Sequence, residues 1–202
     1  MIIEEAGSKI LTDPGIWSNL SLADLNNIDA VLITHEHSDH YDPKAIKNIL
    51  DKNPRVKFIS NTSVSKLLKE LGIDCEVVEH GQSTKLGEIK IEAFGSKHAE
   101  IYKDLGQVQN TGFMLADKLF YAGDAFTPIE RTVPTLALPV CGPWLHIKES
   151  INYALAVKPT YAFPVHDGML KFPGPFHAMP KKILEENKIN FITPELLKPF
   201  DI

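Results

Sequence analysis

His35-Glu36-His37-Ser38-Asp39-His40 is the most informative stretch of this chain, because three of the eight histidines fall within these six residues. It directly follows residues 28–34 (IDAVLIT), an apolar run typical of a buried β-strand. A strand that ends here projects four candidate ligands from one loop and the start of the next helix. Imidazole nitrogens and carboxylate oxygens bind zinc, manganese or iron. A polar, solvated loop is the alternative, but this spacing behind a hydrophobic strand favours a metal site.

Short apolar runs alternate with helical patterns along the rest of the chain. Strands are predicted at residues 28–34, 56–60, 75–78, 86–94, 113–116, 119–121, 136–140 and 160–163, with a tight hairpin at Asp117-Lys118. Helices are predicted from Asp42-Pro43 through residue 50, and at residues 62–71, 148–157 and 181–187. This interleaving predicts an α/β layered fold.

Length and composition limit the classes of protein that fit. The 202 residues predict a single domain, residues 1–202, and the net charge of −5 gives no electrostatic reason to expect a nucleic-acid partner. Cys75 and Cys141 are too few for a disulfide framework, and we expect both to be packing residues in a reducing compartment. Neither a membrane span nor a signal peptide is visible, so the expected location is the cytoplasm, without membrane association.

The histidine run resembles the His-x-His-x-Asp-His signature of the metallo-β-lactamase superfamily, and later segments follow in that family's order. His98 comes after residues 87–94 (GEIKIEAF), Asp124 ends residues 120–124 (FYAGD), and His166 lies in residues 164–168 (PVHDG). Residues 11–15 (LTDPG) are similar to an early turn of the lactonase-like branch. Taken singly, these three residues fit a surface histidine, a turn former and a core histidine, but their order favours ligands.

The resemblance implies a four-layer αββα sandwich with its site at the edge where two sheets meet. By the same resemblance, one metal ion would be held by His35, His37 and His98, and a second by Asp39, His40 and His166, with Asp124 between them. Two cations about 3.5–4 Å apart can share a water and lower its pKa until hydroxide exists at neutral pH. In this scheme Asp39 and Asp124 are the catalytic carboxylates. Zinc is the first choice, and the same donors would accept manganese or iron.

The reaction expected is therefore hydrolysis of a small-molecule lactone, ester or phosphoester. A phosphodiesterase or nuclease is the second hypothesis, and a metal-binding protein without catalysis is the third. Redox chemistry is the weaker case, because the diiron members of the superfamily carry glutamate where His37 stands, and Glu36 lies between the ligands.

Substrate contacts are harder to predict. Trp144, with Phe172 and Phe176, forms either an apolar wall over the metals or part of the core. His146 and His177 lie in loop segments and are candidate substrate-binding residues, whereas His80 is most simply a turn residue.

The beginning of the chain departs from the family pattern. Residues 1–7 are similar to the family's second strand, so a preceding strand is expected to be missing. An unpaired sheet edge would follow, and a homo-oligomer could cover it.

Overall fold

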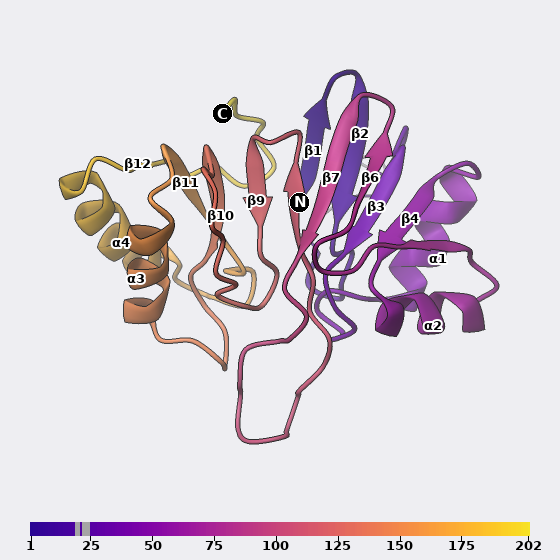
Figure 1. Ribbon diagram of the computed structural model, residues 1–202, viewed down its shortest axis with the longest axis horizontal. Coiled ribbons are helices and arrows are strands. Elements are labelled where there is room, and N and C mark those ends of the chain that lie inside the picture. The colour runs from indigo at the N-terminus through magenta and orange to yellow at the C-terminus, as the bar shows by residue number, and fades with distance from the viewer. Residues whose placement is uncertain (19–20, 22–24) are drawn as a thin grey trace.

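Two β-sheets lie face to face between two pairs of helices, which gives the four layers of an αββα sandwich (Figure 1). The structure is a computed structural model and describes residues 1–18, 21 and 25–202. The five-stranded sheet has the order β1 (Ile2–Glu5), β2 (Ser8–Thr12), β3 (Ala30–Ile33), β4 (Lys57–Ser60) and β5 (Cys75–Val77). The seven-stranded sheet has the order β12 (Asn190–Phe191), β11 (Tyr161–Val165), β10 (Thr135–Pro139), β9 (Leu119–Tyr121), β8 (Gly112–Leu115), β7 (Ile89–Phe94) and β6 (Ser83–Leu86).

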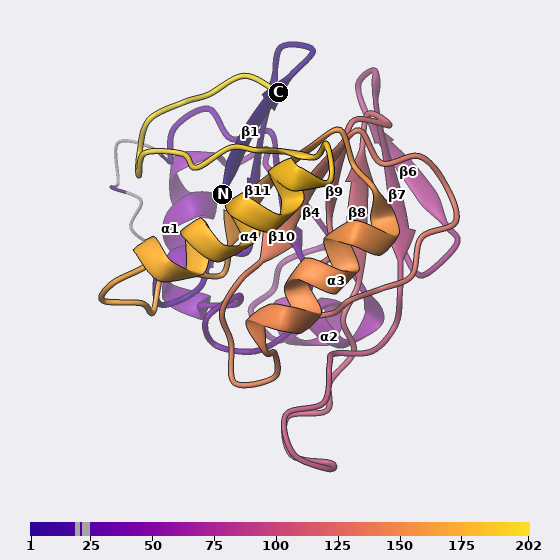
Figure 2. The same ribbon diagram turned by 90° about the vertical axis from the view of Figure 1, so that its left-hand side faces the viewer.

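The helices form the outer layers. Helices α1 (Pro43–Lys52) and α2 (Thr62–Glu70) cover the five-stranded sheet, and α3 (Ile147–Val157) and α4 (Gly174–Glu186) cover the seven-stranded sheet (Figures 1 and 2). Helix α1 begins as its sequence predicts: the Asp42 side chain accepts from the Lys44 backbone N–H, and Pro43 follows directly. Within the described residues, no helix is both long enough and apolar enough to cross a membrane.

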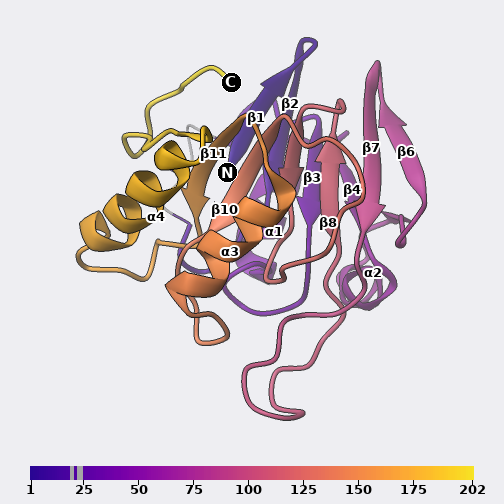
Figure 3. The same cartoon turned by 60° about the vertical axis from the view of Figure 1, so that its left-hand side comes forward.

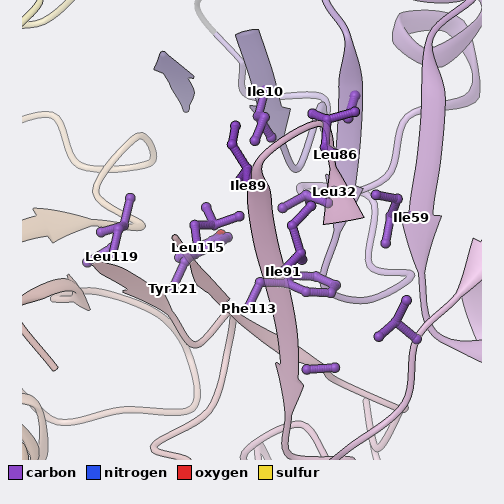
Figure 4. Close-up of a cluster of buried hydrophobic side chains, with 14 of the residues drawn as sticks. Ile10, Leu32, Ile59, Leu86, Ile89, Ile91, Phe113, Leu115, Leu119 and Tyr121 are labelled. Carbon is purple, nitrogen blue, oxygen red and sulfur yellow. The ribbon is translucent and has the colours of Figure 1, made fainter. Parts of the chain in front are cut away.

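The main hydrophobic core lies between the sheets. Ile10, Leu32 and Ile59 from the five-stranded sheet meet Ile91 and Phe113 from the other sheet, and all five are fully buried (Figure 4). Two further apolar clusters lie beneath the helix pairs, one under α1 and α2 and the other under α3 and α4. Burial on both sides of each sheet explains why residues 30–33 read as a continuous apolar run rather than as an alternating one.

Two predicted elements were wrong in their bounds. Residues 86–94 form two strands rather than one, because the chain reverses at Gly87 (φ +58°) and Leu86 pairs with Ile89 in a hairpin. Helix α4 starts at Gly174 rather than at residue 181, since Pro175 occupies its first turn and Pro180 is accommodated inside it. The hairpin at Asp117-Lys118 is confirmed, with Ala116 and Asp117 in left-handed conformations between β8 and β9.

Strand β1 is an outer strand of the five-stranded sheet. It pairs antiparallel with β2, and Ile2 lies opposite Leu11. In the part of the chain that the structure describes, no strand pairs with its other side. The sequence predicts an unpaired sheet edge at this place. That a second copy of the chain covers this edge stays a prediction.

The carboxyl ends of the parallel strands converge on one edge of the sandwich. Strand β3 runs parallel to β2 and β4, and β10 runs parallel to β9 and β11. The connections that follow these strands gather at the lower edge of the molecule, where the segment joining β7 to β8 also projects outward (Figure 3). Loops at the carboxyl ends of strands are the usual place for a binding site in such folds.

The segment after β2 packs directly against the loop that carries Asp39. The Ile16 N–H donates to the Ser38 carbonyl at 2.9 Å, and the Asp42 N–H donates to the Pro14 carbonyl at 3.1 Å. Gly15 lies so close that an added Cβ would be 1.8 Å from the Asp39 carbonyl oxygen. Only glycine fits at this position without moving the backbone.

Gly15→Ala should therefore displace the Asp39 loop and lower the free energy of unfolding by about 1–3 kcal/mol. Gly174→Ala is the matched control, because nothing lies within 4 Å of its added Cβ, and its effect should stay below about 1 kcal/mol. Chemical denaturation measures both. Equal stability of the two variants would show that the Gly15 contact does not constrain the loop.

Candidate metal centre

The four predicted ligands of the histidine run reach the site from the end of β3. His35 and His40 are buried, His37 is half-buried, and Asp39 is partly exposed toward a cleft. His98 follows β7, Asp124 follows β9 and His166 follows β11, so both sheets contribute. The structure thus gathers all seven residues that the sequence nominates as ligands.

The seven residues fall into two groups of possible ligands. His35, His37 and His98 form one group, and Asp39, His40, Asp124 and His166 form the other. Within each group, one ligand atom from every residue lies within 4.8 Å of the others. Asp124 also reaches the first group, since its Oδ2 lies 3.5 Å from Nε2 of His98 and 3.0 Å from Nε2 of His166.

Unpartnered atoms at the centre of the cluster test whether a metal fits. Nε2 of His35, Nε2 of His98, Oδ1 of Asp124 and Nδ1 of His166 are buried without a hydrogen bond, although Oδ1 of Asp124 lies 3.2 Å from Nε2 of His40. A buried polar atom without a partner costs about 1–3 kcal/mol, so several such atoms within one cluster of possible ligands indicate a bound ion that would satisfy them. Nitrogen and oxygen donors in this number suit divalent transition metals. The residues therefore fit metal ions.

Asp13 fixes the orientation of one histidine in each group. Its Oδ2 lies 2.7 Å from Nδ1 of His40 and accepts from Thr34 Oγ1 at 2.8 Å and from Tyr121 Oη at 2.6 Å. Nδ1 of His35 lies 3.0 Å from the same Thr34 hydroxyl. With the proton of each neutral imidazole on Nδ1, Nε2 would offer its lone pair to a bound metal, as is usual for metal-binding histidines. Burial opposes the charge of the Asp13 carboxylate, but the neighbouring His40 keeps the pKa of Asp13 below its ordinary value.

Two further ligands, His98 and Asp124, are also held by hydrogen bonds. Nδ1 of His98 lies 2.6 Å from the Ala99 carbonyl oxygen. The Trp144 indole N–H donates to Oδ2 of Asp124 at 2.7 Å, and the Asp124 backbone N–H donates to Oδ1 of Asn110 at 3.1 Å. Gly123 permits this approach, because it has φ +64° and an added Cβ would lie 2.5 Å from Oδ1 of Asn110.

The two groups differ in their electrostatics. Burial lowers the pKa of His35 well below its ordinary value and also lowers that of His37, which favours the neutral form of both imidazoles. Burial opposes the charge on His40 and His166, but Asp124 and its neighbouring carboxylates raise the pKa of each to about 10. Burial likewise opposes the charge on Asp124, yet His40 and His166 hold its pKa well below the ordinary range. Protons on these imidazoles balance the carboxylates, and a bound cation would take their place.

A cleft of about 520 Å³ opens onto the cluster. His37, Asp39, His98 and Asp124 line it together with Trp144, which is 7% exposed. Trp144 therefore lies against the site, and it also packs edge-on near His98 and Phe126. Trp144 is therefore buried like a core residue and also lines the cleft beside the predicted ligands.

The other predicted substrate contacts lie elsewhere among the described residues. His146 precedes α3 and its backbone N–H donates to Glu149, whereas Nε2 of His177 lies 2.7 Å from Oδ2 of Asp167, and neither histidine lines the cleft. Phe172 is 72% exposed, and Phe176 packs against the core beneath α3 and α4. Phe176 and His177 lie within α4, so the prediction that His177 is in a loop was wrong, because α4 begins earlier than its sequence pattern indicates. Phe172 is in a connecting loop, where no periodic pattern indicates which residues it contacts.

Sequence reasoning missed several residues that shape the site. Trp17, Ile101, Cys141 and Met169 line the cleft, so Cys141 is not only a packing residue as expected. From the sequence, Asp13 was assigned only to a turn, residues 11–15. Asp13 directly follows an apolar strand, as the histidine run does, and this position could have indicated that its side chain lies near the same site.

The comparisons with known proteins agree with this geometry. Residues 1–166 match the family model described as a beta-lactamase superfamily domain, and the chain belongs to the metallo-β-lactamase superfamily. Protein Rv0786c of Mycobacterium tuberculosis is 30% identical over 84% of this chain and 81% of its own length. The UPF0173 metal-dependent hydrolase Ta0764 of Thermoplasma acidophilum is 26% identical over 86% of this chain and 81% of its own length.

Solved structures share the fold. Igni18, a metallo hydrolase from Ignicoccus hospitalis, superposes with a TM-score of 0.73 at 21% identity, covering 96% of this chain and 90% of its own. CmlA, a diiron β-hydroxylase from Streptomyces venezuelae, has the same TM-score of 0.73 at 16% identity, covering 96% of this chain and 51% of its own. One fold thus carries both hydrolytic and redox centres, and the function must be argued from the site. The family and the His/Asp cluster together support a metal-dependent hydrolase.

Asp13→Asn should lower the affinity for metal by about 10- to 100-fold, because one hydrogen-bond acceptor for His40, Thr34 and Tyr121 is replaced by an amide. Competition with a chromogenic chelator measures this affinity. Asp29→Asn is the matched control, since the Asp29 side chain accepts from the exposed backbone N–H of Lys9 at the other end of β2 and belongs to neither group of ligands. Unchanged affinity in Asp13→Asn would contradict the proposed anchoring.

Proposed function

We propose that this chain is a hydrolase that uses two divalent metal ions to cleave an ester, lactone or phosphoester bond in a small molecule. The observation that carries the proposal is the set of buried, unpartnered ligand atoms on His35, His98 and Asp124 within the His/Asp cluster, beside an open cleft that His98 and Asp124 line. Zinc is the first choice of metal, and manganese or iron would suit the same donors.

The site would hold the two ions in its two groups of ligands. His35, His37 and His98 would bind one, and Asp39, His40 and His166 the other, with Asp124 between them. When bound, the pair would supply a water of lowered pKa and a Lewis acid for the electrophilic oxygen of the substrate.

The two carboxylates have different surroundings and therefore different roles. The Asp124 side chain is only 4% exposed and is held by Trp144, which suits a residue that fixes the spacing of the site. The Asp39 side chain is 19% exposed and lines the cleft. Asp39 is thus the carboxylate placed to orient the attacking water and to accept its proton.

Removal of metal tests the proposal directly. Dialysis against a chelator should abolish hydrolysis, and added zinc, manganese or iron should restore it. Elemental analysis should find close to two equivalents in the wild type and substantially less in His37→Ala and Asp124→Ala. His80→Ala is the matched control, because His80 lies outside both groups and accepts from the Gly95 N–H, so its metal content should not change.

Less than about one-tenth of an equivalent of any transition metal in the wild type would refute the metal site. Turnover is tested with p-nitrophenyl esters, lactones and bis(p-nitrophenyl) phosphate. Full metal occupancy without turnover of any of them would favour a metal-binding protein without catalysis. Cleavage of the phosphodiester alone would favour the nuclease hypothesis.

A further inference from the structure

The walls of the cleft are apolar and come from separate loops. Trp17 follows β2, Ile101 lies between β7 and β8, Pro143 and Trp144 follow β10, and Met169 follows β11. Large apolar side chains are seldom left open to solvent at one place without a ligand or partner, yet Trp17 is 49% and Met169 is 38% exposed. Their convergence over the ligand cluster indicates a surface for the apolar part of a substrate.

The described residues that line this cleft include no lysine or arginine. Its acidic side chains are Asp39 and Asp124. Both belong to the ligand cluster, as do the two histidines that line the cleft, His37 and His98. Sites that bind phosphate or a nucleic-acid backbone usually add lysine or arginine to any metal ions. The chemistry of the lining therefore disfavours a substrate that carries a phosphate, whether in the reacting group or beside it.

The size of the cleft agrees with a small molecule. Its volume of about 520 Å³ lies within the range of roughly 300–1,000 Å³ that is usual for small-molecule sites. Polar groups occupy its floor and apolar groups its walls, which is the usual division between reacting and recognition surfaces.

We propose that the substrate is an uncharged carboxylic ester or lactone whose apolar group lies against Trp17, Ile101 and Met169. This inference rests on the proposed hydrolytic function and narrows it, because it selects carbonyl substrates over phosphoesters. The three side chains determine selectivity, while the metal ligands carry out the reaction. Water adds to the carbonyl carbon and the acyl C–O bond breaks, with one proton of the water passing to the departing oxygen. An ester gives a carboxylic acid and an alcohol, and a lactone gives a single hydroxy acid.

A chain-length series tests the selectivity. Burying one methylene is worth about a fourfold change in kcat/KM, so partial burial of four should favour p-nitrophenyl hexanoate over the acetate by at least about tenfold. Ile101→Ser and Met169→Ser should each reduce this hexanoate-to-acetate ratio by about fivefold or more.

Two matched controls come from the same loops. Leu105 and Phe172 are also apolar and are 67% and 72% exposed, but they do not line the cleft. Leu105→Ser and Phe172→Ser should leave the hexanoate-to-acetate ratio within about twofold of the wild type. A ratio of two rates in one variant is insensitive to partial loss of folded protein.

Binding gives a second readout that needs no turnover. Trp17 and Trp144 are the only tryptophans in the chain, and both line the cleft, so intrinsic fluorescence reports its occupancy. Titration of metal-loaded protein with octan-2-one, an uncharged ketone that cannot be hydrolysed, should change this fluorescence. Ile101→Ser should weaken the binding about fivefold or more, and Leu105→Ser should not.

The outcomes separate this inference from the proposed function. Three results would overturn the apolar subsite but leave the hydrolase standing. They are faster hydrolysis of the acetate than of the hexanoate, faster hydrolysis of bis(p-nitrophenyl) phosphate than of either ester, and an equal change of the hexanoate-to-acetate ratio in Ile101→Ser and Leu105→Ser. Binding of octan-2-one that depends on Ile101, without hydrolysis of any ester, would support the subsite and refute the hydrolase. Absence of both would refute the two together.

Discussion

The carboxylate of Asp13 is the contact on which the site depends, because it joins three parts of the fold at one buried point. It follows β2, accepts the backbone N–H and hydroxyl of Thr34 after β3, and accepts the hydroxyl of Tyr121 in the opposite sheet. Its hydrogen bond to His40, and its link to His35 through Thr34, set one imidazole in each ligand group. The packing of the two sheets is thereby coupled to the geometry of the candidate metal centre.

The cleft has polar residues that belong to the ligand cluster at its floor and apolar residues at its walls. The floor is polar and is built from residues that follow buried strands, so its atoms are placed by the most rigid part of the molecule. The walls are apolar side chains on connecting loops, where sequence can change without disturbing the sheets. Such an arrangement allows one reaction to be kept while the substrate varies, which is how a single fold supports many activities.

Much of this architecture could be predicted from the sequence, but not its details. The pattern of apolar runs predicted an α/β layered fold, and the resemblance of the histidine run, His98, Asp124 and His166 to the superfamily's motifs implied the sandwich and the ligands that the structure gathers. The hairpin at Gly87 was missed although Leu86 and Ile89 break the alternation expected of a single strand, because the regular pattern from Ile89 to Phe94 dominates this stretch. Ile101 and Met169 could not be assigned to the cleft, since loop residues have no periodicity and their neighbours are set by distant segments.

The most direct measurement is an anomalous-diffraction experiment on crystals of the metal-loaded protein at the absorption edge of the bound metal. Two peaks about 3.5–4 Å apart are expected. One should lie among His35, His37 and His98, and the other among Asp39, His40 and His166, with Asp124 between them. A single peak, or peaks away from these residues, would contradict a two-metal centre held by the Asp13 framework.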